Sequence, residues 1–284
     1  MSRRLTYIQA VGHSGSTLLA RLLNLHPGIH SIGSFREIEL LGSDDKDAFC
    51  GCSLPPLECP VWQSILEEFG SNPRPGMFRA TDGTMTARQE KESQRFIDSV
   101  LRATSAESVC ELTHDGRRIQ KYLQKNSEEV LFIHLVRDPR AVLRSYFRLI
   151  EPAGFLARFI LLLRISIFYF RRNVWSMLIG RYYRRKGGVY IRIRYEDVCG
   201  NMDKEIGKVF DQLGLPRLKL AKRFAVEDNH IIGGNVVRLK PLVTVKDDQP
   251  FLSYFSKTML LVQSIVNLPM LILFRYPLLP SSQI

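Results

Sequence analysis

The sequence has few cysteines and no uninterrupted apolar run of the ~20 residues that cross a bilayer. Its five cysteines are an odd number, which argues against a disulfide framework and favours a reducing compartment. The amino terminus enters the apolar run 5–11 without the hydrophobic stretch and small-residue cleavage site of a signal peptide. We therefore expect a cytoplasmic protein, with peripheral contact to a membrane as the alternative.

Acidic residues are also scarce, since 28 Asp and Glu stand against 40 Lys and Arg and leave a formal charge of +12. This charge favours polyanionic ligands such as nucleotides, nucleic acid, anionic lipid or sulfated glycan, but it does not choose among them. A chain of 284 residues can build one complete core. We predict a single domain over residues 1–284, with 257–284 as an apolar tail packed on the domain or on a membrane.

Short apolar runs alternate with longer segments of helical spacing. Residues 5–11 are β-prone, small residues break the run at 12–17, and leucines then recur at helical spacing. Further patterns typical of buried strands lie at 29–32, 109–112, 130–136 and 189–195. The sequence predicts an α/β fold, a P-loop-like parallel sheet of about five strands with helices on both faces.

The small-residue loop carries Gly12, Ser14, Gly15, Ser16 and Thr17 between a strand and a helix. Backbone N–H groups of such a loop can converge on an anion, and the helix dipole adds partial positive charge. A plain turn would suit the same small residues. The lysine of an ATP- or GTP-binding P-loop is absent, because its place is taken by Ser16 or Thr17, so an ordinary nucleoside triphosphatase is disfavoured.

A second candidate anion site follows the strand 130–136. The strand delivers Arg137 to its carboxyl end, and Ser145 lies nearly two turns into a helix that begins after Pro139. An arginine fork with a hydroxyl suits a phosphate. The alternative is that Arg137 and Asp138 form an ion pair that caps the strand.

The loop 12–19 (Gly-His-Ser-Gly-Ser-Thr-Leu-Leu) and the motif 136–145 (Val-Arg-Asp-Pro-Arg-Ala-Val-x-x-Ser) resemble the phosphate-binding motifs of sulfotransferases that use 3′-phosphoadenosine 5′-phosphosulfate (PAPS). The similarity extends to Cys-x-Cys…Cys-Pro-x-Trp at 50–62, Tyr-Glu-Asp at 195–197 and Gly-Asn-x-x-Arg at 234–238. It implies a transferase that passes a sulfonate group from PAPS to a hydroxyl or amine of an unidentified natural product, lipid or glycan, with no nucleic-acid partner. The rivals are a small-molecule kinase and a non-enzymatic basic module that binds membranes or nucleic acid.

The resemblance also assigns roles. The 5′-phosphosulfate would lie on the loop residues Gly12, His13, Ser14, Gly15, Ser16 and Thr17. The 3′-phosphate would bind Arg137 and Ser145, Tyr195 would pack near the adenine, and Asn235 and Arg238 would close over the nucleotide. His13 stands where many relatives carry lysine or arginine, so it would assist the leaving phosphate only when protonated. The catalytic base would be Glu37, with Glu39, His114 and Asp115 as rivals.

Two segments fit the resemblance less directly. Cys50, Cys52 and Cys59 have thiolate spacing, but no fourth ligand lies nearby, so we predict no bound metal and expect a packed or redox-sensitive thiol loop. The strip Phe155–Phe170 is apolar apart from Arg158 and Arg164, and a basic run follows it up to Lys186. The strip suits either a core helix or a wall for a lipophilic or membrane-held acceptor.

Overall fold

The computed structural model describes residues 4–41, 50–78, 85–113, 129–225, 229–234, 239–246 and 251–278. At its centre is a parallel sheet of five strands in the order β2-β3-β1-β4-β5. The strands are β1 (Leu5–Ala10), β2 (Ile29–Gly33), β3 (Ser108–Thr113), β4 (Val130–Val136) and β5 (Val189–Arg194). The predicted α/β fold is therefore confirmed, although the last strand ends one residue early because Tyr195 opens a helix.

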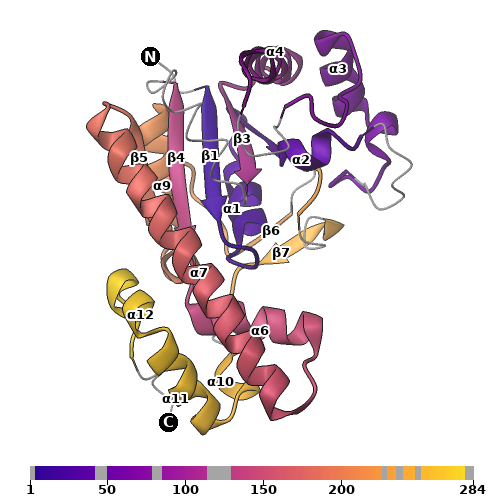
Figure 1. The fold of residues 1–284 in the computed structure, drawn as a ribbon. Coiled ribbons are helices and arrows are strands. Elements are labelled where there is room, and N and C mark those ends of the chain that lie inside the picture. Colours follow the sequence, from indigo (N-terminus) through magenta and orange to yellow (C-terminus); the bar gives the residue numbers. More distant parts are fainter. Residues whose placement is uncertain are drawn as a thin grey trace.

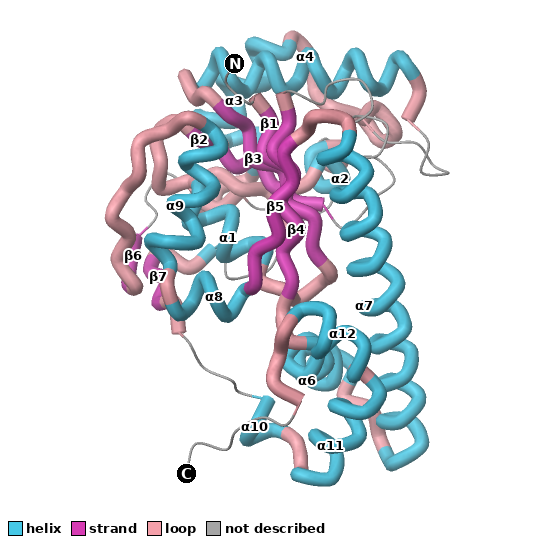
Figure 2. The backbone as a smooth tube through the Cα atoms, turned by 90° about the vertical axis from the view of Figure 1, so that its left-hand side faces the viewer, coloured by secondary structure: helices cyan, strands magenta, loops and turns pink. Residues whose placement is uncertain are grey.

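Helices cover both faces of the sheet, as predicted. One face carries α1 (Ser16–Leu23), α8 (Tyr195–Gly200) and α9 (Met202–Leu213), which pack on alternate residues of β1 and β4. The other face carries α2 (Phe35–Ile38), α3 (Pro60–Phe69), α4 (Ala87–Thr104) and the second half of α7 (Gly154–Arg185). Figure 2 has α9 and α1 on one side of the sheet and α7 on the other.

The adjacent inner strands β1 and β4 are buried along their whole length. A parallel sheet covered on two faces favours apolar side chains in both directions, so these strands are mostly apolar rather than alternating, with Thr6, Gln9 and His134 as the buried polar exceptions. The run-like pattern in the sequence was therefore a correct signal for the sheet interior.

A layer of helices lies beyond the carboxyl ends of the strands (Figure 1). It consists of α6 (Pro139–Ile150), the first half of α7, α10 (Phe251–Tyr254), α11 (Lys257–Val266) and α12 (Leu268–Phe274). Leu260, Met270 and Phe274 of the expected tail are buried there. The tail thus packs on the rest of the domain.

Smaller elements connect these layers. A 3₁₀ turn at Pro56–Glu58 precedes α3, and an antiparallel pair is formed by β6 (Arg223–Ala225) and β7 (Leu242–Thr244). This pair was not predicted, because three-residue strands are too short to give a pattern.

After the neighbouring strands β1 and β4, the chain continues toward opposite edges of the sheet. The chain after β1 crosses toward β2, and the chain after β4 crosses toward β5 on the other side of the sheet. Open α/β sheets bind ligands outside the carboxyl ends of strands at such a reversal. The loop 11–15 and Arg137 both lie at this point.

Candidate functional site

The loop after β1 turns the chain tightly into α1. The Ser14 N–H donates to the Val11 carbonyl at 3.1 Å, and Gly15 has a left-handed backbone with a φ of 93°. A Cβ at Gly15 would also overlap the ring of Tyr195, so both conformation and space require glycine. The first N–H groups of α1 have no partner within the helix, and its dipole adds positive character there. The loop can therefore receive an anion.

Two polar groups near this loop are buried without a partner. The Ser14 hydroxyl and the Nε of Arg137 have no hydrogen-bond partner among the described residues. Burying such groups unsatisfied costs roughly 1–3 kcal/mol each. An anion at this place would accept hydrogen bonds from both kinds of donor.

His13 and Gly12 lie against Tyr146 of α6. The imidazole meets the phenol ring edge-on with 4.8 Å between the centroids, and a Cβ at Gly12 would come within 2.9 Å of the hydroxyl. Burial raises the pKa of Tyr146, so its hydroxyl stays protonated. The loop is thus held from the α6 side by an aromatic contact.

Arg137 joins the two segments of the sequence that are candidates for phosphate binding. Its Nη1 donates to the His13 carbonyl at 3.0 Å, and its guanidinium carbon lies 4.1 Å from the ring centroid of Tyr195. The alternative ion pair of Arg137 with Asp138 is wrong. Asp138 instead caps α6 and forms a buried two-point pair with Arg140, with oxygen–nitrogen distances of 2.6 and 2.9 Å.

Ser145 directly precedes Tyr146, the α6 residue whose ring contacts His13. It sits on α6 roughly 9 Å along the axis from Pro139, given a rise of about 1.5 Å for each residue. Its half-buried hydroxyl donates to the Ala141 carbonyl at 3.3 Å. The hydroxyl oxygen keeps its acceptor sites, and the donor can turn to a ligand.

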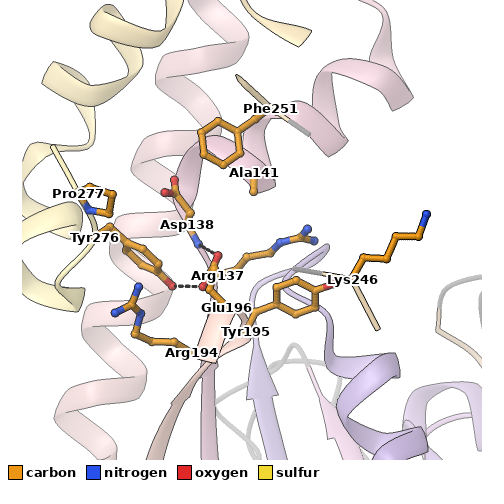
Figure 3. A pocket seen from close by; sticks show the side chains of 10 residues that line it. All are labelled: Arg137, Asp138, Ala141, Arg194, Tyr195, Glu196, Lys246, Phe251, Tyr276 and Pro277. Atoms are coloured by element: carbon orange, nitrogen blue, oxygen red, sulfur yellow. Dashed lines mark hydrogen bonds between the residues drawn. The ribbon is translucent and has the colours of Figure 1, made fainter. Parts of the chain in front are cut away.

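A cavity of about 60 Å³ opens beside Arg137 (Figure 3). A single water needs ~10–15 Å³, so this space suits a phosphate-sized group but does not enclose a nucleotide. Its wall includes Lys246, which lies on the same side as Arg137 and which the sequence analysis missed. The exposed Lys246 follows β7 and belongs to no recognisable motif.

The opposite wall of this cavity is a hydrogen-bonded unit. The Glu196 carboxylate accepts from the Asp138 N–H and from the Tyr276 hydroxyl, both at 2.9 Å. Burial raises the pKa of Glu196, although these hydrogen bonds oppose the shift. The guanidinium of Arg194 lies over the Tyr276 ring at 4.3 Å. The carboxyl-terminal segment is therefore fixed to the end of β5 and shapes the site.

Glu37 and Glu39 occupy different environments although they are two residues apart. Glu39 is fully buried and accepts a hydrogen bond from the Phe78 N–H at 2.6 Å, which assigns it to the core. Glu37 is half-buried at the carboxyl end of β2, and a Cβ at Gly233 would overlap its side chain. The next glycine, Gly234, approaches the Thr17 hydroxyl. Glu37 therefore lies beside Gly233, and the adjacent Gly234 lies beside the loop 12–17.

Four predicted site residues lie outside the described part of the chain. They are His114, Asp115, Asn235 and Arg238.

The apolar strip forms the first half of α7, and much of it is exposed. Phe155 and Leu156 are 79% and 69% exposed, whereas Ser166, Asn173 and Ser176 are buried. Of the two alternatives for the strip, a core helix is therefore wrong for its exposed part.

Whether a helix can span a membrane depends on its length and its apolar composition. Within the described ranges, no single helix is long and apolar enough to cross a membrane. The pair α11 and α12 together reaches that length and composition, with a bend of 74° between the two helices.

The chain is similar to a known protein family in sequence and to solved structures in fold. A family model described as the sulfotransferase family matches residues 7–219. No curated protein shows significant sequence similarity. The sulfotransferase domain from the curacin biosynthetic pathway has 13% identity and a TM-score of 0.52, over 99% of each chain.

Two further structures align less closely in space. Mouse sulfotransferase SULT7A1 complexed with PAP has 13% identity and a TM-score of 0.49, over 94% of this chain and 84% of that one. The sulfotransferase domain of the Synechococcus PCC 7002 olefin synthase has 20% identity and a TM-score of 0.45, over 75% and 74%. Because the family model matches well over half of the residues, the chain belongs to the sulfotransferase family of enzymes.

Proposed function

We propose that this enzyme transfers a sulfonate group from PAPS to a hydroxyl or amine of its acceptor. The observation that carries the proposal is the hydrogen bond from Arg137 to the His13 carbonyl, which joins two anion-binding elements at the reversal of the sheet. PAPS carries phosphates at both its 3′ and 5′ positions. A paired site of this kind suits it better than it suits ATP, whose usual lysine is absent from the loop.

The loop residues 12–17 would hold the 5′-phosphosulfate through their backbone N–H groups. The partnerless Ser14 hydroxyl supports this assignment. Arg137 would bind the 3′-phosphate, with Ser145 as a second donor and Lys246 as an additional cation beside the cavity. Tyr195 would pack near the adenine and also hold Arg137 and Gly15 in place.

The transfer breaks the bond between sulfur and the 5′-phosphate oxygen and forms a bond from sulfur to the acceptor oxygen or nitrogen. Glu37 would take the acceptor proton as that bond forms. The loop N–H groups, with protonated His13, would stabilise the charge that develops on the departing phosphate. The protein would act mainly by positioning and electrostatics, as in phosphoryl transfer. Asn235 and Arg238 would close over the nucleotide.

The acceptor proposed here is lipophilic or held in a membrane. Apolar side chains on the outside of α7 support this class, since Phe155, Leu156 and Ile160 are exposed next to the basic Arg158 and Arg164. Burying each such apolar side chain releases ~1.5–3 kcal/mol. Arginines at the same surface would attract anionic headgroups.

The test is a screen with PAPS labelled in the sulfonate group. Lipid extracts, lipophilic natural products and polar glycans are offered as acceptors, and a parallel series uses γ-labelled ATP. We expect sulfonate to appear on a lipophilic acceptor and no transfer from ATP. Phosphoryl transfer from ATP would identify a kinase and contradict the proposal, while sulfation of polar acceptors alone would contradict the acceptor class.

A further inference from the structure

Three cysteine thiols and one histidine imidazole lie close together in the fold. The Sγ atoms of Cys50, Cys52 and Cys59 and a ring nitrogen of His230 all lie within 4.8 Å of one another. Cys50 and Cys59 are buried, and the other two are partly exposed. The fourth ligand that the local sequence lacks is therefore supplied from 171 residues beyond Cys59.

The distances match those of a tetrahedral metal site. Zinc bonds of ~2.3 Å to sulfur and ~2.0–2.1 Å to nitrogen place two sulfurs ~3.8 Å apart and a sulfur and a nitrogen ~3.6 Å apart. Here the Sγ atoms of Cys50 and Cys59 are 3.7 Å apart, and Nδ1 of His230 lies 3.7 and 3.2 Å from them. We propose that these three thiolates and this imidazole bind one zinc ion as a closed structural site, in place of the metal-free thiol loop expected from the sequence.

A disulfide explains the arrangement less well. A disulfide joins two sulfurs at ~2.05 Å and leaves the rest of a cluster without a role. In this cluster a third thiol and an imidazole nitrogen face the same point. The remaining cysteines, Cys110 and Cys199, are buried in a different hydrophobic cluster.

Hydrogen bonds to the main chain hold the two ligand segments together. Trp62 Nε1 donates to the His230 carbonyl at 2.8 Å, and the Gly51 N–H donates to the Ile231 carbonyl at 3.0 Å. Cys50 and Ile232 also form an isolated β-bridge. Partners of this kind orient ligands and raise the affinity of a site. The Nδ1 atom is the ring nitrogen that faces the thiols.

The proposed metal would stabilise a segment that contacts the candidate active site. The segment that carries His230 continues to Gly233, which contacts Glu37, and to Gly234, which contacts Thr17. Four protein ligands leave no open position for a substrate, so the ion would act in folding rather than in chemistry. It would fix the segment that joins the proposed base to the phosphate loop.

The experiment measures metal in the full chain purified without chelator. Inductively coupled plasma mass spectrometry should find about one zinc ion per chain. Cys59→Ser and His230→Ala should each lower zinc affinity at least ~10-fold, while Cys199→Ser retains it as a matched control. Cys52→Ser changes a partly exposed ligand and serves if the buried variants do not fold.

A second measurement uses the wild-type protein and does not depend on whether the variants fold. Protein loaded with cobalt should show the visible ligand-field bands and near-ultraviolet thiolate charge-transfer bands of a tetrahedral thiolate site. Removal of zinc by a chelator should lower the melting temperature of the wild type. Metal-free protein with a Cys50–Cys59 disulfide in its non-reduced peptide map, or with all thiols free and no melting shift on adding zinc, would overturn the proposal.

Discussion

The guanidinium of Arg137 lies 4.1 Å from the ring centroid of Tyr195, and the same ring lies against Gly15 of the phosphate loop. One side chain at the end of β5 therefore supports both proposed phosphate-binding elements. This contact ties three strands of the sheet together at their carboxyl ends.

Replacing Tyr195 with leucine should remove the cation–π contact and loosen the loop. Such contacts contribute ~0.5–2 kcal/mol, so we expect the affinity for 3′,5′-adenosine bisphosphate to fall by a corresponding ~2- to 30-fold. Tyr195→Phe keeps the ring and should retain most of the affinity. Isothermal titration calorimetry compares the three proteins. Equal affinities for the leucine variant and the wild type would show that the ring does not support binding.

Glu37→Gln should lower the rate of sulfonate transfer by ~100-fold or more, because the amide cannot accept the acceptor proton. Nucleotide affinity should not change. Glu39→Gln is the informative comparison, since Glu39 is buried and accepts a hydrogen bond from the Phe78 N–H. This substitution should change the free energy of unfolding rather than the transfer step. Single-turnover measurements with labelled PAPS separate these effects, and near-native turnover of Glu37→Gln would assign the base elsewhere.

Glu196 should make folding stability depend on pH. Burial raises its pKa above the usual 4.5, so the folded protein binds this proton more tightly than the unfolded chain does. The favourable contribution is complete below pH 4.5 and is lost as pH rises through the raised folded value.

Glu196→Gln keeps an acceptor for the Asp138 N–H but cannot ionise. Its free energy of unfolding should therefore gain on the wild type as pH rises from about 4.5 through the raised folded pKa of Glu196. Denaturant titrations at several pH values measure the difference. The exposed Glu67→Gln is the control, and a difference for Glu196→Gln that does not change with pH would refute the assignment.

The α7 surface should bind anionic vesicles at low ionic strength and release them at high salt, because the arginine attraction is screened. Phe155→Ser combined with Leu156→Ser removes two exposed apolar side chains and should weaken binding ~10-fold or more. Leu54→Ser, an exposed leucine outside α7, is the control. Sedimentation gives the bound fraction, and wild-type protein that stays in the supernatant at low salt would remove the membrane hypothesis.

The sheet and the tight turn between β1 and α1 could be predicted because their signals are local. Buried parallel strands need continuous apolar runs, and a strand-to-helix turn needs small residues. The placement of Arg137 followed from the end of one such strand. These features depend on neighbours in the sequence, which a pattern can express.

Features that depend on distant segments could not be predicted. His230 joins the cysteines from 171 residues away, and Lys246 reaches the cavity from a segment without a motif. Glu37 lies in the short helix α2 and Glu39 directly follows it, so the sequence could not assign one of them to the core. The outward apolar face of α7 was also hidden, since the strip reads alike whether it is covered or exposed.

Recognition of the 3′-phosphate is the central claim, and calorimetry with two nucleotides tests it directly. The wild type should bind 3′,5′-adenosine bisphosphate ~30-fold or more tightly than adenosine 5′-monophosphate, since a charge-assisted contact of about 2 kcal/mol depends on that phosphate. Arg137→Ala should lose most of this preference, while Arg148→Ala, which changes an exposed arginine on the following helix α6, should keep it. Equal affinity of the wild type for both nucleotides, or an unchanged preference in a folded Arg137→Ala protein, would contradict the account.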